Sequence, residues 1–292
     1  MNHSLPIQLV ECPRDAMQGW KHFIPTEKKI AYLEQLLQVG FHTLDFGSFV
    51  SAKAIPQMAD THEVIQHLQI PEPAQGRAAT KLLAIVANKR GAEEAVRYPR
   101  INCLGFPFSV SPTFQQRNTN SSIEESLVRV AEIKELCEAN GKELVIYISM
   151  AFGNPYGDAY NEEVVFGWVS RIAAMNIQTI SLADTVGLAK PDQVFRMTDY
   201  VIRQLPGHTV GVHLHSTALN WKEKIDAALQ AGCNRFDGAL KGIGGCPMAN
   251  DELVGNMNSE WMIPYFNSLS RLEPLNPEAL ASAINMAGEI FV

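Results

Sequence analysis

Two histidines, His213 and His215, stand two positions apart in a short apolar run of the 292-residue chain. Side chains alternate along a β-strand with a period of two, so both imidazoles would point the same way. Two neutral imidazoles on one face can bind a divalent metal. The pair alone could equally be two polar residues at a strand end, so the rest of the chain must decide between these readings.

Other polar residues also stand at or near the ends of short apolar runs. They are Arg14 and Asp15, Asp45 and Ser48, Ser149, and Asp184 with Thr185. Asp15 could add a carboxylate to the two imidazoles, a donor set that suits a divalent ion with open positions for water and substrate. Alternatively, Arg14 and Asp15 could form an ordinary strand-end pair, Asp184 could cap the next turn, and Asp45 could orient Arg14 or accept backbone hydrogen bonds.

A glycine-rich loop, Gly242–Pro247, carries Cys246 after two glycines. A thiol on such a loop can be brought over a site when the loop closes. The alternatives are that Cys246 is a small apolar residue in a turn, or that Gly244 and Gly245 approach a phosphate.

Eight strand-like runs, each followed by a helical pattern, would position these side chains. The predicted strands are Ile7–Cys12, Thr43–Phe49, Leu82–Ala87, Asn102–Phe108, Leu144–Ser149, Thr179–Ala183, Thr209–His215 and Arg235–Leu240. Several are continuously apolar, as strands buried on both faces are. The pattern predicts the α/β class and a (β/α)8 TIM barrel, whose active site would lie at the C-terminal ends of the strands.

The intervening segments predict helices and one long polar loop. The helices are expected over Pro25–Val39, Ile55–Leu68, Gly91–Tyr98, Ser122–Asn140, Asn161–Met175, Pro191–Gln204 and Leu219–Ala231, with a last helical region from about Asp251 and a loop over Ser109–Ser121. We expect one domain over residues 1–292, with the barrel over about 7–257 and a C-terminal helical extension over about 258–292. A doubly wound sheet would need a Gly-x-Gly-x-x-Gly turn that Glu11–Gln18 lacks.

Composition narrows the classes of function. The chain is 46% hydrophobic and 19% charged, with a net charge of −7, which is typical of a globular protein and argues against nucleic-acid or membrane binding. Five scattered cysteines argue against a disulfide framework. No secretory signal pattern opens the chain, so we expect a cytoplasmic protein. A few local cations would still allow an anionic substrate.

Five motifs occur in order and resemble those of the 3-hydroxy-3-methylglutaryl-CoA (HMG-CoA) lyases, within the metal-dependent barrel lyases and Claisen-type synthases. The motifs start at Val10 (VECPRDAMQ), Ser48 (SFVSAK, then IPQM), Ser181 (SLADTVG), His213 (HLH) and Gly242 (GIGGCPMA). The resemblance covers about residues 7–257. It implies a divalent-metal-dependent lyase that cleaves HMG-CoA to acetyl-CoA and acetoacetate, and it suggests a homodimer.

The resemblance also implies roles for individual residues. It makes Asp15, His213, His215 and Asn256 the ligands of Mg²⁺ or Mn²⁺. The remaining implied site residues are Arg14 at the enolate oxygen, Cys246 near the carbon that gains a proton, Asp184 within reach of the substrate hydroxyl, Asp45 as the second-strand acid, and Gln18, Ser48 and Thr185 at the substrate.

Four positions depart from the pattern of these lyases. Asp45 replaces a glutamate, Val145 replaces an arginine, Pro112 stands where an acid follows the serine, and Ser216 stands where an aspartate follows the second histidine. The departures leave open a related aldolase or Claisen-type enzyme acting on another hydroxy-acyl-CoA or a 2-oxo acid, and a non-catalytic barrel. Lys53 and Lys241 are the candidates for holding an anionic CoA tail, with ordinary surface lysines as the alternative.

Overall fold

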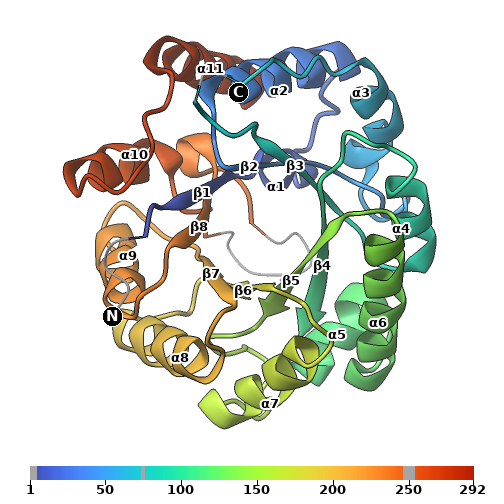
Figure 1. The fold of residues 1–292 in the computed structure, drawn as a ribbon, viewed down its shortest axis with the longest axis vertical. Coiled ribbons are helices and arrows are strands. Elements are labelled where there is room, and N and C mark those ends of the chain that lie inside the picture. The colour runs from blue at the N-terminus through green and yellow to red at the C-terminus, as the bar shows by residue number, and fades with distance from the viewer. Residues whose placement is uncertain (1–4, 74–75, 246–253) are drawn as a thin grey trace.

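Eight parallel strands close into a barrel in the order β1 to β8, and the helices surround it (Figure 1). The computed structural model describes residues 5–73, 76–245 and 254–292. The strands are β1 (Gln8–Glu11), β2 (Thr43–Ser48), β3 (Lys81–Ile85), β4 (Cys103–Ser109), β5 (Glu143–Ser149), β6 (Thr179–Ala183), β7 (Thr209–His213) and β8 (Arg235–Gly238). The predicted TIM barrel is confirmed.

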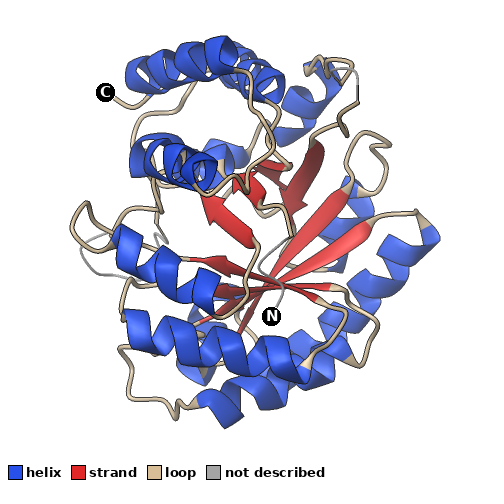
Figure 2. Ribbon diagram, turned by 60° about the vertical axis from the view of Figure 1, so that its left-hand side comes forward, coloured by secondary structure: helices blue, strands red, loops and turns tan. Residues whose placement is uncertain are grey.

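Helices cover the outside of the strands and bury the apolar core between the two layers (Figure 2). They are α2 (Thr26–Val39), α3 (Thr61–His67), α4 (Lys89–Ala95), α6 (Ile123–Ala139), α7 (Glu162–Ala173), α8 (Pro191–Gln204) and α9 (Trp221–Gln230). Ser122 begins α6 with a capping box that includes Glu125. Gly40 ends α2 in the left-handed conformation, which glycine adopts without strain.

The predicted loop over 109–121 contains a helix, α5 (Pro112–Thr119), so that expectation was wrong. The Ser111 hydroxyl accepts a hydrogen bond from the backbone N–H of Phe114 at 3.1 Å, and Pro112 supplies a first residue already suited to a helix. Phe114 is buried and anchors the helix. The polar composition hid this element, because α5 buries only one face.

Two other boundaries differ from the prediction. The helix expected over 55–68 is divided into a 3-10 turn, η1 (Pro56–Met58), and α3. The strand expected to reach His215 ends at His213, and His215 instead pairs with Asn256 in an isolated antiparallel bridge. The second histidine is therefore held by the segment that follows β8 rather than by the barrel sheet.

The chain after β8 forms the 3-10 turn η2 (Leu240–Gly242) and then α10 (Ser259–Ser268) and α11 (Pro277–Ile290). Phe266 of α10 packs on Phe236 of β8, with ring centroids 5.0 Å apart, so α10 acts as the eighth barrel helix. The additional helix is α11, which lies beside α2 (Figure 1); the Gln35 side chain donates to the Ala279 carbonyl at 3.1 Å. The extension beyond the barrel therefore begins after α10.

Candidate active site

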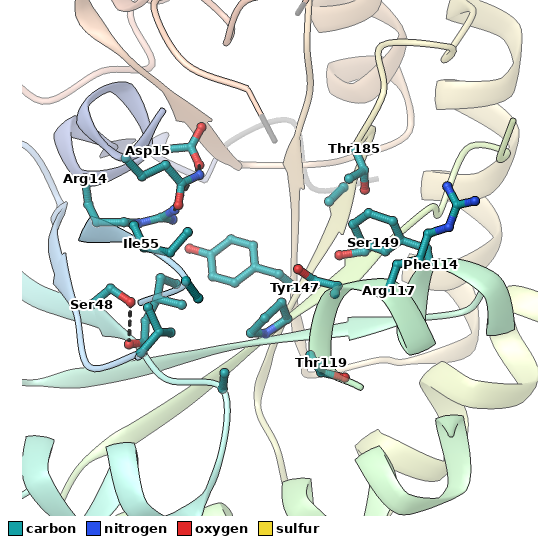
Figure 3. A pocket seen from close by; sticks show the side chains of 18 of the residues that line it. Arg14, Asp15, Ser48, Ile55, Phe114, Arg117, Thr119, Tyr147, Ser149 and Thr185 are labelled. Carbon is teal, nitrogen blue, oxygen red and sulfur yellow. Dashed lines mark hydrogen bonds and ion pairs between the residues drawn. The ribbon is translucent and has the colours of Figure 1, made fainter. Parts of the chain in front are cut away.

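A cavity of about 690 Å³ opens at the C-terminal ends of the strands (Figure 3). Its lining includes eight of the residues predicted for the site, namely Arg14, Asp15, Gln18, Asp45, Ser48, Thr185, His213 and His215. Asp184 and Asn256 do not line it, and Cys246 lies outside the described residues. The topology therefore gathers most of the predicted polar residues at one end of the barrel.

A short helix, α1 (Pro13–Gln18), follows β1 directly and carries the first group of these residues. Pro13 starts it, because a proline fits the first helical position. Arg14 and Asp15, which the sequence placed at the end of the strand, lie on this helix together with Gln18. One turn of helix thus presents an arginine, a carboxylate and an amide to the same cavity.

Arg14 is the centre of a buried hydrogen-bond network. Its Nε donates to Oδ2 of Asp45 at 3.0 Å, and its Nη1 donates to Asp15 at 2.9 Å and to Gln18 at 3.0 Å. A second donor to Asp45 comes from Nη2. Gln18 in turn donates to Asp15 at 2.7 Å. The guanidinium is thereby fixed in one orientation beside the cavity, since a fork of donors is held by two carboxylates.

Asp15, His213 and His215 form a group that could hold a metal ion. One ligand atom from each lies within 4.8 Å of the others. Asn256 completes the group: its Nδ2 donates to Asp15 at 2.7 Å, while its buried Oδ1 has no hydrogen-bond partner among the described residues. A buried acceptor without a donor costs free energy. Two imidazoles, a carboxylate and a spare amide oxygen therefore fit a divalent cation with nitrogen and oxygen ligands.

The electrostatics of Asp15 and His215 favour their metal-binding protonation states. Burial opposes ionisation of Asp15, but the Arg14 guanidinium and the neighbouring imidazoles outweigh it and lower the pKa of Asp15 to about 2. Burial, assisted by His213, lowers the pKa of His215 to about 4. At neutral pH, Asp15 is therefore ionised and His215 neutral, which are the forms that ligate metals. For His213, burial lowers the pKa, but the hydrogen bond to Asp237 and the charges of Asp237 and Asp15 outweigh burial, so the pKa of His213 is raised.

The pKa of Asp45, the carboxylic acid on β2, shifts in the opposite direction to that of Asp15. Burial raises the pKa of Asp45 to about 6, against the opposing effect of Arg14. Asp45 lines the cavity and its side chain is buried. A carboxylate with a pKa near neutrality can accept a proton during a reaction and release it again.

Asp184 lies beneath the cavity instead of facing it. Its Oδ2 accepts from Nζ of Lys224 at 2.9 Å, and its Oδ1 accepts from the Ala189 backbone at 3.0 Å. Lys224 also donates to the His215 carbonyl at 2.7 Å. Asp184 does not line the cavity and both of its oxygens accept from protein donors, so its contact with a substrate hydroxyl stays a prediction. Asp184 supports the backbone of His215.

Sequence reasoning missed several residues at the site. Phe114, Arg117, Thr119 and Arg129 line the cavity from α5 and α6, whereas Lys53 and Lys241 do not. Three further residues lie beneath the cavity, namely Lys224, Arg235 and Asp237. The available signals were a lysine on the apolar face of the predicted helix over 219–231, and two charged residues at alternate positions of the predicted strand over 235–240.

The four residues that depart from the lyase pattern lie in different parts of the structure. Val145 faces the barrel interior with Tyr147, Pro112 begins α5, and Ser216 directs its hydroxyl to the sulfur of Met257 at 3.3 Å. None of these three lines the cavity. Asp45 is therefore the departure that bears directly on the chemistry.

Comparisons with known proteins agree with this site. The family model HMGL-like matches residues 7–286. A 3-hydroxy-3-methylglutaryl-CoA lyase, cytoplasmic, from Rattus norvegicus is 33% identical over 90% of this chain and 75% of its own length. A 3-hydroxy-3-isohexenylglutaryl-CoA/hydroxy-methylglutaryl-CoA lyase from Pseudomonas aeruginosa is 32% identical over 97% of this chain and 92% of its own length.

Solved structures give the same result. An HMG-CoA lyase from Acinetobacter baumannii, in complex with coenzyme A and 3-methylmalate, superposes with a TM-score of 0.88 at 29% identity, covering 100% of this chain and 92% of that one. The HMG-CoA lyase from Brucella melitensis also reaches a TM-score of 0.88, at 27% identity and 99% coverage of both chains. The chain therefore belongs to the HMGL-like family and is an HMG-CoA lyase-like lyase.

Proposed function

We propose that the chain is a divalent-metal-dependent lyase that cleaves HMG-CoA to acetyl-CoA and acetoacetate by retro-Claisen chemistry. The observation that carries the proposal is the convergence of ligand atoms from Asp15, His213 and His215 within 4.8 Å, beside a fixed arginine in an open cavity. The unpartnered Oδ1 of Asn256 adds a fourth donor.

The four donors would hold Mg²⁺ or Mn²⁺, which supplies Lewis-acid stabilisation of the substrate alkoxide and carboxylate when bound. Arg14 would stabilise the charge that develops on the thioester oxygen. All three of its nitrogens already donate to protein acceptors, but Nη2 has two N–H groups and only its bond to Asp45 is made among the described residues, so one donor remains for the substrate. The fixed guanidinium needs no reorganisation during the reaction.

Proton transfers need an acid and a base. Asp45, with a pKa raised by burial to about 6, lines the cavity and would accept the substrate hydroxyl proton at a lone pair that its bonds from Arg14 leave free. Cys246 would donate the proton to the departing carbon from the loop after η2, as the family resemblance implies. Gln18, Ser48 and Thr185 would contact the substrate, since each lines the same cavity.

The cavity also suits a substrate with an acyl-CoA shape. Arg14 and the two histidines contribute polar lining, whereas Ile55, Ile85 and Phe114 contribute apolar wall. Arg117 and Arg129 lie on the α5–α6 side and supply positive charge to the cavity. These features support an anionic acyl-CoA ligand, with the reacting acyl group at the metal end.

The deciding experiment incubates the purified protein with HMG-CoA and Mg²⁺ or Mn²⁺ and measures acetoacetate, with His215→Ala as the control. We expect acetoacetate from the wild type and none from the variant. If metal binds stoichiometrically and no acetoacetate forms, the chain acts on another hydroxy-acyl-CoA or a 2-oxo acid. If no metal binds, the proposed function is wrong.

We also propose a homodimer, which rests on the family resemblance, and a cytoplasmic location, which the relative from Rattus norvegicus has by its name. None of the helices in the described residues is long and apolar enough to cross a membrane. Sedimentation equilibrium of the purified chain would test the dimer, and a monomer at micromolar concentration would contradict it. Fractionation of cells that express the chain would test its location.

A further inference from the structure

Beneath His213 lies a buried pair of charged residues, Arg235 and Asp237, that the chemistry above does not use. Both belong to β8, and because side chains alternate along a strand, they point to the same side, into the barrel. Nη1 of Arg235 donates to Oδ1 of Asp237 at 2.9 Å, and both side chains are at most 3% exposed. The other oxygen of Asp237 lies 3.3 Å from Nδ1 of His213.

The barrel fixes the position of this arginine. Gly211 of β7 pairs with Arg235, and a Cβ at Gly211 would lie 3.1 Å from Cγ and Cδ of the arginine. The glycine therefore leaves the space that the arginine stem fills. Nη2 of Arg235 also points to the Tyr147 hydroxyl at 3.5 Å, at the limit of a hydrogen bond. Val145, where the related lyases have an arginine, lines the same small cavity as Arg235, at the N-terminal ends of the strands.

We propose that Arg235 and Asp237 are positioning residues for the metal site, acting through the Nδ1 of His213. The proposal rests on the proposed metal-dependent function. An ionised carboxylate can only accept hydrogen bonds, so Nδ1 must carry the proton and Nε2 keeps its lone pair for a ligand. Arg235 supplies the counter-charge that a carboxylate buried at this depth requires.

The pair also decides between two sets of donors that share His213. One set is Asp15, His213 and His215, and the other is Cys12, His213 and Asp237, each with ligand atoms within 4.8 Å of one another. In the second set, Asp237 is already paired with Arg235 and hydrogen-bonded to His213. Arg235 therefore commits His213 to the set that faces the cavity.

The test measures Mn²⁺ binding to the metal-free protein by titration calorimetry, for wild type, Asp237→Asn, Arg235→Met and Arg235→Lys. Partners that hold a ligating histidine typically change metal affinity 10–100-fold. We expect a loss of about this size for Asp237→Asn and Arg235→Met, and partial recovery with Arg235→Lys, which keeps the charge. Lys29→Met removes another buried ion pair, Lys29 with Asp60 at 2.7 Å, and should leave the affinity unchanged.

A second readout needs no metal. In ¹⁵N spectra of histidine-labelled protein, at a pH where the ring is neutral, His213 should be wholly in the Nδ1–H form in wild type and in Lys29→Met. Asp237→Asn should show a mixture of the two tautomers, because an amide can both donate and accept. If the tautomer and the Mn²⁺ affinity stay unchanged in Asp237→Asn and Arg235→Met, the proposal is overturned.

The two readouts separate the failure of this proposal from failure of the proposed function. A wild type that binds no Mn²⁺ refutes the metal-dependent function, and the positioning of a ligand with it, whatever the tautomer. A wild type that binds Mn²⁺ with an affinity insensitive to Arg235 and Asp237 refutes only the positioning role. Should Asp237→Asn fail to fold, the two Arg235 variants supply the same comparison.

Discussion

The side-chain amide of Asn256 donates to Oδ2 of Asp15 at 2.7 Å, which joins two segments 241 positions apart in the chain. The same Nδ2 donates to the Ile243 carbonyl at 2.9 Å. The nitrogen is thus engaged twice, and Oδ1 remains without a partner among the residues that the structure describes. The contact aligns Asn256 so that its free oxygen can join the proposed ligands.

The first prediction concerns this oxygen. Asn256→Ala should weaken Mn²⁺ binding roughly tenfold or more, because it removes one donor and the hydrogen bond that orients Asp15. Titration calorimetry on the metal-free protein measures the change. Asn258→Ala is the matched control, since Asn258 caps α10 two positions later. That control should lower stability by about 1 kcal/mol and leave Mn²⁺ binding intact; equal Mn²⁺ affinity in Asn256→Ala and wild type would refute Asn256 as a ligand.

The second prediction concerns Arg14. Arg14→Ala should lower kcat about 100- to 1000-fold, because loss of one preorganised oxyanion donor typically costs roughly 2.7–4 kcal/mol. Arg14→Lys should recover little, since an ammonium lacks the planar fork whose separate nitrogens reach Asp45 on one side and Asp15 and Gln18 on the other. Acetoacetate formation measures both variants. Arg90→Ala, at an exposed arginine, should keep wild-type activity; an Arg14→Ala enzyme with more than a tenth of the wild-type kcat would contradict the assigned role.

The sequence was sufficient to predict the barrel and most of the residues that meet at its C-terminal end. Alternation of apolar strands and helices is a local property, and the closed barrel then brings Asp15, Asp45 and His213 to one cavity. The sequence could identify the site residues because the C-terminal ends of the parallel strands all lie on the same face of the barrel. The distances and contacts between these side chains could not be predicted from the sequence, since they depend on side-chain packing across the barrel.

Two of the features that the structure places differently, Asp184 and His215, depend on contacts with distant residues. The sequence suggests that Asp184 faces the cavity, but in the structure its carboxylate accepts a hydrogen bond from Lys224 of α9 at 2.9 Å. The sequence suggests that His215 belongs to β7, but in the structure it forms an isolated bridge with Asn256. The helix α5 was hidden by its polar composition, although Ser111 and Pro112 form a helix start. The first two differences arose where a partner far away in the sequence determined the local structure, whereas α5 had a local start signal that its polar composition obscured.

The third prediction tests a close approach between α4 and the residue that follows β2. Gly91 lies in α4, and a Cβ there would stand 2.3 Å from the Phe49 carbonyl oxygen. Gly91→Ala should therefore destabilise the fold by about 1–3 kcal/mol, as overpacking does. Alanine is otherwise the better helix residue by about 1 kcal/mol. Gly167→Ala in α7, where a Cβ meets nothing within 4 Å, should stabilise the fold. Urea unfolding measures both variants, and a change of the same sign would refute the argument.

The last prediction concerns Glu11, a fully buried residue of β1 that links the barrel to the chain after β8. Its Oε1 accepts from the Leu240 backbone at 2.7 Å, and its Oε2 contacts the Ser259 hydroxyl. Burial raises the pKa of Glu11 from 4.5 to about 8, against the lowering effect of these hydrogen bonds. The folded state therefore holds a proton at Glu11 between about pH 4.5 and 8 that the unfolded state has released.

Because the folded state binds the extra proton, this contribution to stability is lost as the pH rises from 4.5 to 8 and stays constant above 8. The slope is at most about 1.4 kcal/mol per pH unit. Glu11→Gln should remove this pH dependence of stability, since an amide accepts from Leu240 and donates to Ser259 without ionising. Urea unfolding at pH 5, 6.5 and 8 (roughly spanning the titration) measures the free energy of unfolding. As the pH rises, this free energy should increase for the variant relative to the wild type. Glu72→Gln, at an exposed glutamate, should show no such trend; parallel profiles for Glu11→Gln and wild type would mean that Glu11 is already ionised in the folded protein at pH 5.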